Sequence, residues 1–254
     1  DNLPAPSIAL PGEYFNTKLY TGTGAELAVT GVGFQPDFTW IKTRALTYNH
    51  RVFDVVRGVT KELYTNDTDA EVTDAQSLKS FDSDGFTLGT GSGSNPSSTM
   101  ASWNWKAGGA ASANTDGTIN SSVSVNATAG FSIVSFTGNQ TSGATVGHGL
   151  SQAPELIIIK GLPDVDQWSV YFAPVGNTKA SYLNLDNAPA TATGFWNDTS
   201  PTASVFTLGN ETQLNKNANP YISYCFHSVE GYSKVGSYNG NGNSDGPFVY
   251  TGFK

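Results

Sequence analysis

The sequence predicts an all-β protein made of two tandem, homologous antiparallel β-sandwiches of the jelly-roll kind, followed by the first hairpin of a third. Three observations support this prediction. The 254 residues are weakly charged, with 13% charged residues, 12% aromatic residues and 28 glycines, which is typical of strands joined by many turns. The apolar runs are short and rich in β-branched and aromatic residues. Four sequence blocks also recur in the same order.

The recurring blocks lie at a nearly constant offset. "FQPDFTWIK" aligns with "QAPELIIIK", which places Pro36 on Pro154 at an offset of 118 residues (154 − 36 = 118). The offset is 116 for "FNTKLYTG" and "FSIVSFTG", 120 for the two copies of "FTLG", and 121 for "ASWNW" and "ISYCF". Loop insertions between duplicated domains produce such slow growth. We therefore expect Pro36 and Pro154 to enter equivalent strands, and Trp40 and Ile158 to be equivalent positions.

These blocks predict the organisation of the chain. We expect an extended N-terminal segment, a first sandwich, a linker or edge strand, a second sandwich, and a partial third repeat that packs on the second. "YSKVGSYNGNG" opens this third copy and is too short to fold alone, so we expect it to pair with the second sheet. Its open edge predicts a homo-oligomer or a longer chain. The expected ranges are 1–13, 14–109, 110–129, 130–231 and 232–254.

The individual elements follow from local patterns. "FTWIK", "RVFDVV" and "FSIVSF" are predicted strands, because clusters of Gly, Asn, Asp and Pro bound them. "ELIIIK" is continuously apolar, which predicts a central strand covered on both faces. "FDSDGFTLG" (81–89) predicts a hairpin in which Asp-Gly supplies positive φ. Trp103 and Trp105 alternate, so both rings should face the core. No window keeps helical spacing over three turns, which predicts little helix.

Composition argues against several classes of partner. The net charge of −8 disfavours nucleic-acid binding, which needs a cationic face. No window approaches the ~20 apolar residues of a membrane span, so no membrane insertion is expected. Cys225 is the only cysteine and excludes an internal disulfide; its alternating context predicts a packed position. Arg44, Arg51 and Arg57 lie in one stretch, as a solvated edge or as ion pairs with neighbouring acids.

The sequence contains no recognisable catalytic motif. His50, His148 and His227 lie outside any nucleophile elbow or paired metal motif. The glutamates are isolated, and the E-x-D-x-x-E pattern of sandwich glucanases does not occur. We therefore name no catalytic residue. Carboxylates that converge from different strands would leave an enzyme as the alternative, namely a polysaccharide depolymerase or lyase.

A calcium site is the one cofactor hypothesis that the sequence offers. Asp82 and Asp84 in "DSDG", with further aspartates upstream, could supply oxygen ligands. The alternative interpretation is a polar hairpin turn. No other cofactor is expected.

A sugar site is the remaining hypothesis. Sugar-binding sandwiches stack an exposed aromatic ring on a pyranose and bind its hydroxyls through Asn, Asp and backbone amides. Trp196 has the favourable loop context, because Asn197 and Asp198 follow it directly in "TGFWNDTSP". Trp168 is the second candidate aromatic residue. Core packing is the alternative for Trp196.

The quoted blocks resemble a known repeat family. "GVGFQPDFTWIKTR", "NHRVFDVVRGVTKELYTND", "VGHGLSQAPELIIIK" and "GYSKVGSYNGNGNSDGPFVYTGF" are similar to modules of large virion proteins of marine tailed bacteriophages, such as tail fibres or other surface appendages. These modules look related to concanavalin A-like, laminin G-like sandwiches. The resemblance covers about Leu3 to Lys254 and implies no catalytic residues.

The resemblance implies a place in the virion. The expected function is a structural, non-enzymatic virion module that adheres to host-surface glycans. Its expected partners are other virion protein subunits and host-surface polysaccharide. The alternatives are the depolymerase or lyase named above and a capsid decoration protein.

Overall fold

The computed structural model describes residues 6–252 of the chain. Residues 1–5 of the expected N-terminal segment and residues 253–254 of the expected third repeat lie outside this range. Strands make up 38% of the structure and helices 4%, so the predicted all-β class and the low helix content are confirmed. No helix of the described part has the length and apolarity needed to cross a membrane.

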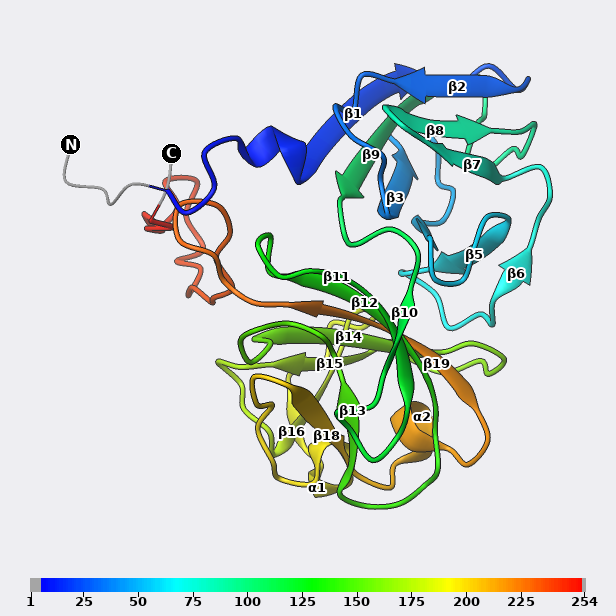
Figure 1. The fold of residues 1–254 in the computed structure, drawn as a ribbon. Helices are drawn as coiled ribbons and strands as arrows, with labels where there is room; N and C mark the ends of the chain where they lie inside the picture. Colours follow the sequence, from blue (N-terminus) through cyan, green and yellow to red (C-terminus); the bar gives the residue numbers. More distant parts are fainter. Residues whose placement is uncertain (1–5, 253–254) are drawn as a thin grey trace.

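The first half of the chain forms a unit with one large and one small antiparallel sheet (Figure 1). The strands of the large sheet are β1 (Phe15–Thr21), β3 (Phe38–Thr43), β4 (Arg51–Asp54), β5 (Lys61–Tyr64), β6 (Val72–Thr73) and β9 (Thr99–Trp105). The small sheet consists of β2 (Leu27–Thr30), β7 (Leu78–Asp82) and β8 (Gly85–Leu88). The large sheet has the order β1-β9-β3-β4-β5-β6 and the small sheet the order β2-β8-β7.

The second half forms a unit of the same kind below the first in Figure 1. Its large sheet contains β10 (Ser112–Asn114), β11 (Ser121–Asn126), β12 (Phe131–Thr137), β14 (Leu156–Gly161), β15 (Ser169–Phe172), β16 (Lys179–Tyr182), β17 (Ala190–Thr191) and β19 (Pro220–Phe226). The small sheet pairs β13 (Ala144–Gly147) with β18 (Val205–Leu208). Two single-turn helices, α1 (Thr193–Trp196) and α2 (Thr212–Asn215), flank β18 in the chain.

The strand order of the first large sheet recurs in the second. The second sheet runs β10-β11-β12-β19-β14-β15-β16-β17, in which the last six strands repeat the order β1-β9-β3-β4-β5-β6. The register also agrees, because Trp40 lies opposite Trp103 and Ile158 lies opposite Tyr224. The expected linker range carries β10 and β11, which cover the edge of β12. Within residues 6–252, β1 has no such neighbour on its outer edge.

The acid that follows each aligned proline caps the end of a central strand. Asp37 accepts hydrogen bonds from the backbone N–H groups of Ala107 at 2.7 Å and Gly109 at 3.2 Å. Glu155 accepts one from the N–H of Ser228 at 2.6 Å. Each carboxylate thus holds the chain where it leaves β9 or β19. This shared task explains why an acid stands at both positions.

Asn95 is buried and holds together the loops at one end of the first sandwich. Its Oδ1 accepts a hydrogen bond from the N–H of Thr23 at 2.8 Å. Its Nδ2 donates to the carbonyl oxygens of Ala25 and Gly89. The side chain is fully buried, so these backbone groups have it as a partner in place of water.

Asn215 makes the same connections in the second sandwich. Its Oδ1 accepts from the N–H groups of Asn139 at 2.9 Å and Gln140 at 3.2 Å. Its Nδ2 donates to the carbonyls of Thr141 at 3.1 Å and Gly209 at 2.7 Å. The offset from Asn95 to Asn215 is 120, the same as for the two "FTLG" blocks.

Three apolar cores separate the four sheets. The first lies inside the first unit around Ile41 and Phe86, and the second lies inside the second unit around Ile157 and Phe206. The third lies between the two large sheets, where rings of both units meet; Phe38 and Tyr224 have ring centroids 4.4 Å apart. We call it the central core. The sequence did not predict that the two sandwiches share it.

Strand β14 serves two of these cores. Ile157 and Ile159 face the core of the second unit, whereas Leu156 and Ile158 pack into the central core. The prediction that "ELIIIK" forms a strand covered on both faces is therefore confirmed. The predicted burial of Cys225 is confirmed as well, and this burial raises the pKa of its thiol to about 12.

The segment after β19 does not pair as we expected. No strand occurs among residues 227–252, and Val229 with Ser233 forms only an isolated bridge. The physical reason is that β12 and β14 already occupy both edges of β19, which leaves no free edge there for "YSKVGSYNG". The turn is held instead by Ser228 Oγ, which accepts the N–H of Val235 at 3.0 Å.

The N-terminal segment lies against this turn. Ser7 donates its N–H to the carbonyl of Glu230 at 3.0 Å, and Ile8 is buried. The rings of Tyr14 and Tyr232 make an edge contact with centroids 6.4 Å apart. A 3-10 turn, Pro11–Glu13, lies between these two contacts, and β1 begins directly after Tyr14. The N-terminal segment therefore packs on the second unit before it enters the first.

Candidate functional site

A cleft lined by aromatic residues of both units lies between the two large sheets. Its inner part is an apolar cavity of about 270 Å³ in the central core, lined by Trp40, Trp105, Trp168 and Tyr224 among others. Its outer part is an open groove of about 500 Å³. The two parts share Trp40, Thr65 and Leu183 in their walls. The groove is lined by Trp40, His50, Thr65, Asn66 and the stretch 183–186.

Trp40 and His50 form the aromatic wall of the groove. The indole N–H of Trp40 donates to Nδ1 of His50 at 3.1 Å, and the two rings meet edge to face with centroids 6.0 Å apart. Burial, and then the charge of Lys42, lowers the pKa of the His50 imidazole. The ring is therefore neutral at pH 7, with its proton on Nε2, since Nδ1 is the acceptor.

Equivalent asparagines from the two units form the polar walls. Asn66 Oδ1 accepts the backbone N–H of His50 at 2.7 Å, and Asn184 Oδ1 accepts the backbone N–H of Trp168 at 3.0 Å. Both pairs are related by the offset of 118 that aligns Pro36 with Pro154. Each amide is fixed by the protein and keeps further hydrogen-bonding capacity.

Asp186 supplies the charge of the groove. Its carboxylate is exposed, and it makes no hydrogen bond or ion pair with another described residue. The groove thus combines an indole ring, two ordered amides and one available carboxylate. This combination can bind a hydroxylated ring by stacking and hydrogen bonding.

A buried lysine positions the wall that carries Thr65 and Asn66. Lys160 is fully buried, and its ammonium donates to the carbonyls of Thr68 at 3.0 Å and Asp166 at 3.0 Å, and to that of Asp164 at 2.8 Å. Burial lowers the pKa of this ammonium. Lys160 therefore ties the loop of the first unit to a loop of the second at the edge of the groove.

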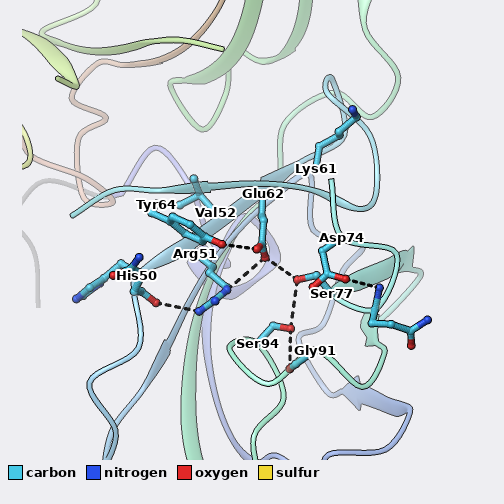
Figure 2. A network of polar contacts seen from close by, with 12 residues as sticks. His50, Arg51, Val52, Lys61, Glu62, Tyr64, Asp74, Ser77, Gly91 and Ser94 are labelled. Atoms are coloured by element: carbon cyan, nitrogen blue, oxygen red, sulfur yellow. Dashed lines mark hydrogen bonds and ion pairs between the residues drawn. The ribbon is translucent and has the colours of Figure 1, made fainter. Parts of the chain in front are cut away.

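A buried polar network joins the strands that lead into the groove (Figure 2). Glu62 accepts from Tyr64 Oη at 2.6 Å through Oε1, and from Arg51 Nε at 3.2 Å and Ser77 Oγ at 2.8 Å through Oε2. Arg51 lies over the ring of Tyr64 at 5.0 Å. A Cβ at Gly93 would fall 1.9 Å from the same guanidinium, so any larger residue there would displace the Arg51 side chain.

This network is a structural one. Both oxygens of Glu62 have donors within the protein, and the side chain is 3% exposed. Burial, and then the hydrogen bond to Glu62, raises the pKa of the Tyr64 phenol to about 12. Figure 2 shows the imidazole of His50 turned away from Glu62. Tyrosine, arginine and histidine side chains therefore occur here, but they do not converge on one point.

A second ion cluster lies inside the interface between the units. Arg57 Nε lies 2.6 Å from Asp54 Oδ2, which also accepts a hydrogen bond from Tyr224 Oη at 2.8 Å. Arg57 Nη1 lies 3.2 Å from Glu71. Burial opposes the charge on Arg57, but Asp54, Tyr224 and Glu71 together outweigh it and raise the pKa of the guanidinium. Of the two alternatives for the arginines, ion pairing with neighbouring acids therefore describes Arg51 and Arg57.

The sugar-binding residues expected from the sequence do not come together. Trp168 lies in the cleft, fully buried, with its indole N–H donated to the carbonyl of Tyr64 at 2.8 Å. Trp196 is 1% exposed in the core of the second unit, and its indole N–H donates to the backbone carbonyl of Lys179 at 3.2 Å. A ring in that position has no face for a ligand, so the expected stacking platform at Trp196 is corrected to a core residue.

Asn197 and Asp198 remain at the surface, away from the cleft. Both have left-handed backbones, with φ of 52° and 50°, at the end of α1. Asn197 accepts a hydrogen bond from Ser142 Oγ at 2.7 Å. They shape a turn over the second unit and do not line the groove.

The aspartates considered for calcium are occupied by protein donors. Asp84 accepts the N–H groups of Gly31 at 2.9 Å and Gly33 at 2.7 Å, which lowers the pKa of its carboxyl group. Asp82 accepts from Ser80 Oγ and Thr87 Oγ1, both at 2.7 Å. The polar-turn alternative describes both side chains. Among residues 6–252, no cluster of three or more His, Cys, Asp or Glu could hold a metal ion.

The hairpin that carries these aspartates is confirmed, with a different turn. Asp82 pairs with Gly85, so Ser83 and Asp84 form the two-residue loop. We expected Asp-Gly to supply the residues with positive φ; Gly85 has a φ of 150°, whereas Asp84 is not among the positive-φ residues. Gly85 belongs to β8 and is needed there because a Cβ would fall 1.9 Å from the carbonyl oxygen of Val29.

His148 makes the stability of the second unit depend on pH. It is fully buried; Nδ1 accepts the N–H of Leu150 and Nε2 donates to the carbonyl of Thr202, both at 3.1 Å. Burial lowers the pKa of the folded imidazole below 6.5. The unfolded chain therefore binds a proton first as the pH falls, so the free energy of unfolding decreases below about pH 6.5, with a slope up to about 1.4 kcal/mol per pH unit.

Denaturant titrations between about pH 7 and pH 5.5 measure this slope. The His148→Gln variant should show a smaller slope than the natural chain, because its amide does not titrate. His50 adds to the slope in the same direction. An unchanged slope in His148→Gln would contradict the assignment.

The family of the chain can now be stated. A family model described as "Domain of unknown function (DUF7483)" matches residues 10–254. The chain belongs to this family. The DUF7483 match runs through both sandwiches, so the groove and its walls lie within one family domain. No curated protein and no solved structure matches the chain.

Sequence reasoning missed the residues that make the groove. Trp40 was recognised only as a repeat position, and Asn66, Asn184 and Asp186 were not singled out. One signal was present, since Asn66 and Asn184 recur at the offset of 118 within dissimilar stretches, "ELYTND" and "ASYLNLD". An identical asparagine in an otherwise changed loop indicates a fixed backbone contact.

Proposed function

We propose that this DUF7483 chain is a structural and adhesion module of a bacteriophage virion, part of a tail fibre or other surface appendage, which binds host-surface glycan in the groove between its two units. The groove is the observation that carries the binding role, because Trp40, Asn66, Asn184 and Asp186 meet there from both halves. The phage location rests on the sequence resemblance. Host-surface polysaccharide and other virion subunits are the proposed partners.

The groove suits a sugar for a physical reason. A pyranose presents an apolar face and a rim of hydroxyl groups, and Trp40 with the two amides offers the matching pair of surfaces. Both asparagines are already fixed by backbone donors at 2.7 Å and 3.0 Å. Binding therefore immobilises few side chains, and less of the interaction energy is lost to ordering.

The proposed architecture is a tandem duplication of a concanavalin A-like jelly roll. The repeated strand order, the acids that cap β9 and β19, and the paired asparagines support it. Superposition of residues 14–109 on residues 130–231 should match most strands. Failure to match them would reject the duplication.

Binding should depend on Asp186 and not on Asp198. The Asp186→Ala variant removes the available carboxylate of the groove, and we expect the affinity for a bound glycan to fall about ten- to a hundredfold, as for the loss of one charged hydrogen bond. Asp198→Ala is the matched control, since it removes an exposed aspartate outside the groove. An array of bacterial surface saccharides identifies the ligand, and calorimetry measures both variants.

The same material separates the rival functions. A depolymerase or lyase would release reducing or unsaturated ends from the bound polysaccharide, whereas an adhesin leaves its length unchanged. A capsid decoration protein would label the head of the particle rather than the tail in electron micrographs. Absence of binding across the array, or equal loss in Asp186→Ala and Asp198→Ala, would reject the groove as the glycan site.

A further inference from the structure

A second cavity opens at the other end of the cleft, against the turn that follows β19. It has a volume of about 750 Å³ and shares His227, Ser233 and Lys234 with the apolar cavity of the central core. Its walls come from the N-terminal segment, the loop before β12, the turn after β19 and the stretch 250–252. The side chains in these walls are mostly polar, and they include Ser7, Thr128, Gln152, Glu230, Lys234 and Tyr250.

His227 brings an unpaired acceptor to this cavity. The residue is 4% exposed, and its Nδ1 lies 2.8 Å from the carbonyl oxygen of Ser228. A carbonyl oxygen can only accept, so Nδ1 carries the proton and Nε2 of the neutral ring is bare. Nε2 is buried and has no partner among residues 6–252. Buried polar atoms of this kind normally have a donor.

The other two histidines have the opposite arrangement. His50 and His148 each accept a hydrogen bond at Nδ1, from Trp40 and from the N–H of Leu150. Their protons are therefore on Nε2. Among the three histidines, His227 alone has a bare Nε2, and the residue lines the polar cavity.

The charges in the walls indicate the class of ligand. Lys234 and Glu230 both line the cavity and carry opposite charges, so an ion of either sign gains little net attraction. Tyr250 is 66% exposed and offers a ring face at the same place. Hydroxyl and amide groups supply the remaining contacts. A neutral, hydroxylated ring fits this combination better than a phosphate or a metal ion.

We propose that this cavity is a second saccharide subsite, in which a sugar hydroxyl donates a hydrogen bond to Nε2 of His227 and the sugar ring packs on Tyr250. The choice of a saccharide rests on the proposed glycan-binding function, but the residues are distinct from those of the groove. The two sites lie at opposite ends of one cleft. A single glycan chain that fills both is held more tightly than either end alone.

Imidazole NMR of the full chain tests the subsite directly. The chain has three histidines, one in the groove, one in the cavity and one fully buried, so each site has its own reporter. The probe is a panel of glucose, galactose, mannose and N-acetylglucosamine, added to ¹⁵N-labelled protein. The free protein should show His227 protonated on Nδ1, and sugar should shift the His227 Nε2 resonance. His148 should not move.

The outcomes separate the two proposals. A shift of the His227 resonance supports the subsite, whether or not the His50 resonance shifts. A shift of the His50 resonance without one at His227 overturns the subsite and leaves the groove as the glycan site. Movement of neither overturns both for these sugars, and a free protein with His227 protonated on Nε2 overturns the acceptor role.

A surface variant gives a second measurement that does not depend on folding. For the sugar that shifts the His227 resonance, Tyr250→Ala should lower the binding affinity by about three- to tenfold, because it removes the ring on which the sugar packs. Tyr238→Ala is the matched control, since Tyr238 is 69% exposed in the same segment and does not line the cavity. Equal affinities for the two variants would remove Tyr250 from the site and overturn the proposed packing.

Discussion

Replacement of Asp54 by alanine is expected to lower the free energy of unfolding by about 3–5 kcal/mol, because it removes the nearer of the two carboxylates that pair with the buried charge of Arg57 and leaves only Glu71. Arg57 would keep its guanidinium with a side chain that is 2% exposed. Tyr224 would lose the acceptor of its hydroxyl, which lies 2.8 Å away in the natural chain. Asp54 belongs to the first unit and Tyr224 to the second, so both units should lose stability together.

Chemical denaturation followed by tryptophan fluorescence and by circular dichroism measures this effect. Tyr224→Phe should cost only about 1 kcal/mol, since it removes one hydrogen bond and no charge. Glu26→Ala is the exposed control; Glu26 pairs with Lys79 at the surface, where ion pairs contribute less than about 1 kcal/mol. A loss below about 1 kcal/mol in Asp54→Ala would contradict the buried-pair interpretation.

The second large effect is expected at the paired asparagines. Asn95→Ala and Asn215→Ala should each cost about 4 kcal/mol, because each change leaves several buried backbone groups without partners. The two losses should be similar, since the side chains make the same contacts in the two units. Denaturant midpoints of the single variants give the comparison.

Asn187→Ala provides the control for these variants. Asn187 is exposed in the loop between β16 and β17, so its replacement should change the stability by less than about 0.5 kcal/mol. A large loss of stability in one of the two variants and none in the other would show that the two asparagines do not contribute equally to the stability of their units.

The strands could be predicted because their signals are local. Alternation, turn residues and the offset of 118 located β3 and β14, and they placed Trp40 and Ile158 at corresponding register positions. The apolar run of β14 also required cover on both faces. Nothing in the sequence named the covering surface, since an apolar face on one sheet fits any apolar face of suitable shape.

The candidate site could not be predicted for the same reason. The groove exists only where the two units meet, and its asparagines lie in loops whose sequences otherwise differ. The prediction for Trp196 was wrong because the polar residues that follow it form an exposed turn, whereas the indole ring itself points into the core of the second unit. The segment after β19 misled it because sequence similarity to a first strand does not provide an unoccupied edge.

The contact between the two large sheets has a consequence for longer assemblies. The same face of each unit takes part in it, because Phe38 and Trp105 on one side correspond to Leu156 and Phe226 on the other. Such a self-complementary contact is isologous and is complete after two copies, whereas head-to-tail contacts propagate. Under the proposed duplication, the domain is thus a covalent pseudo-dimer. A third sandwich of this kind would find no such face unoccupied, so we expect a longer string of these sandwiches to be built of pairs.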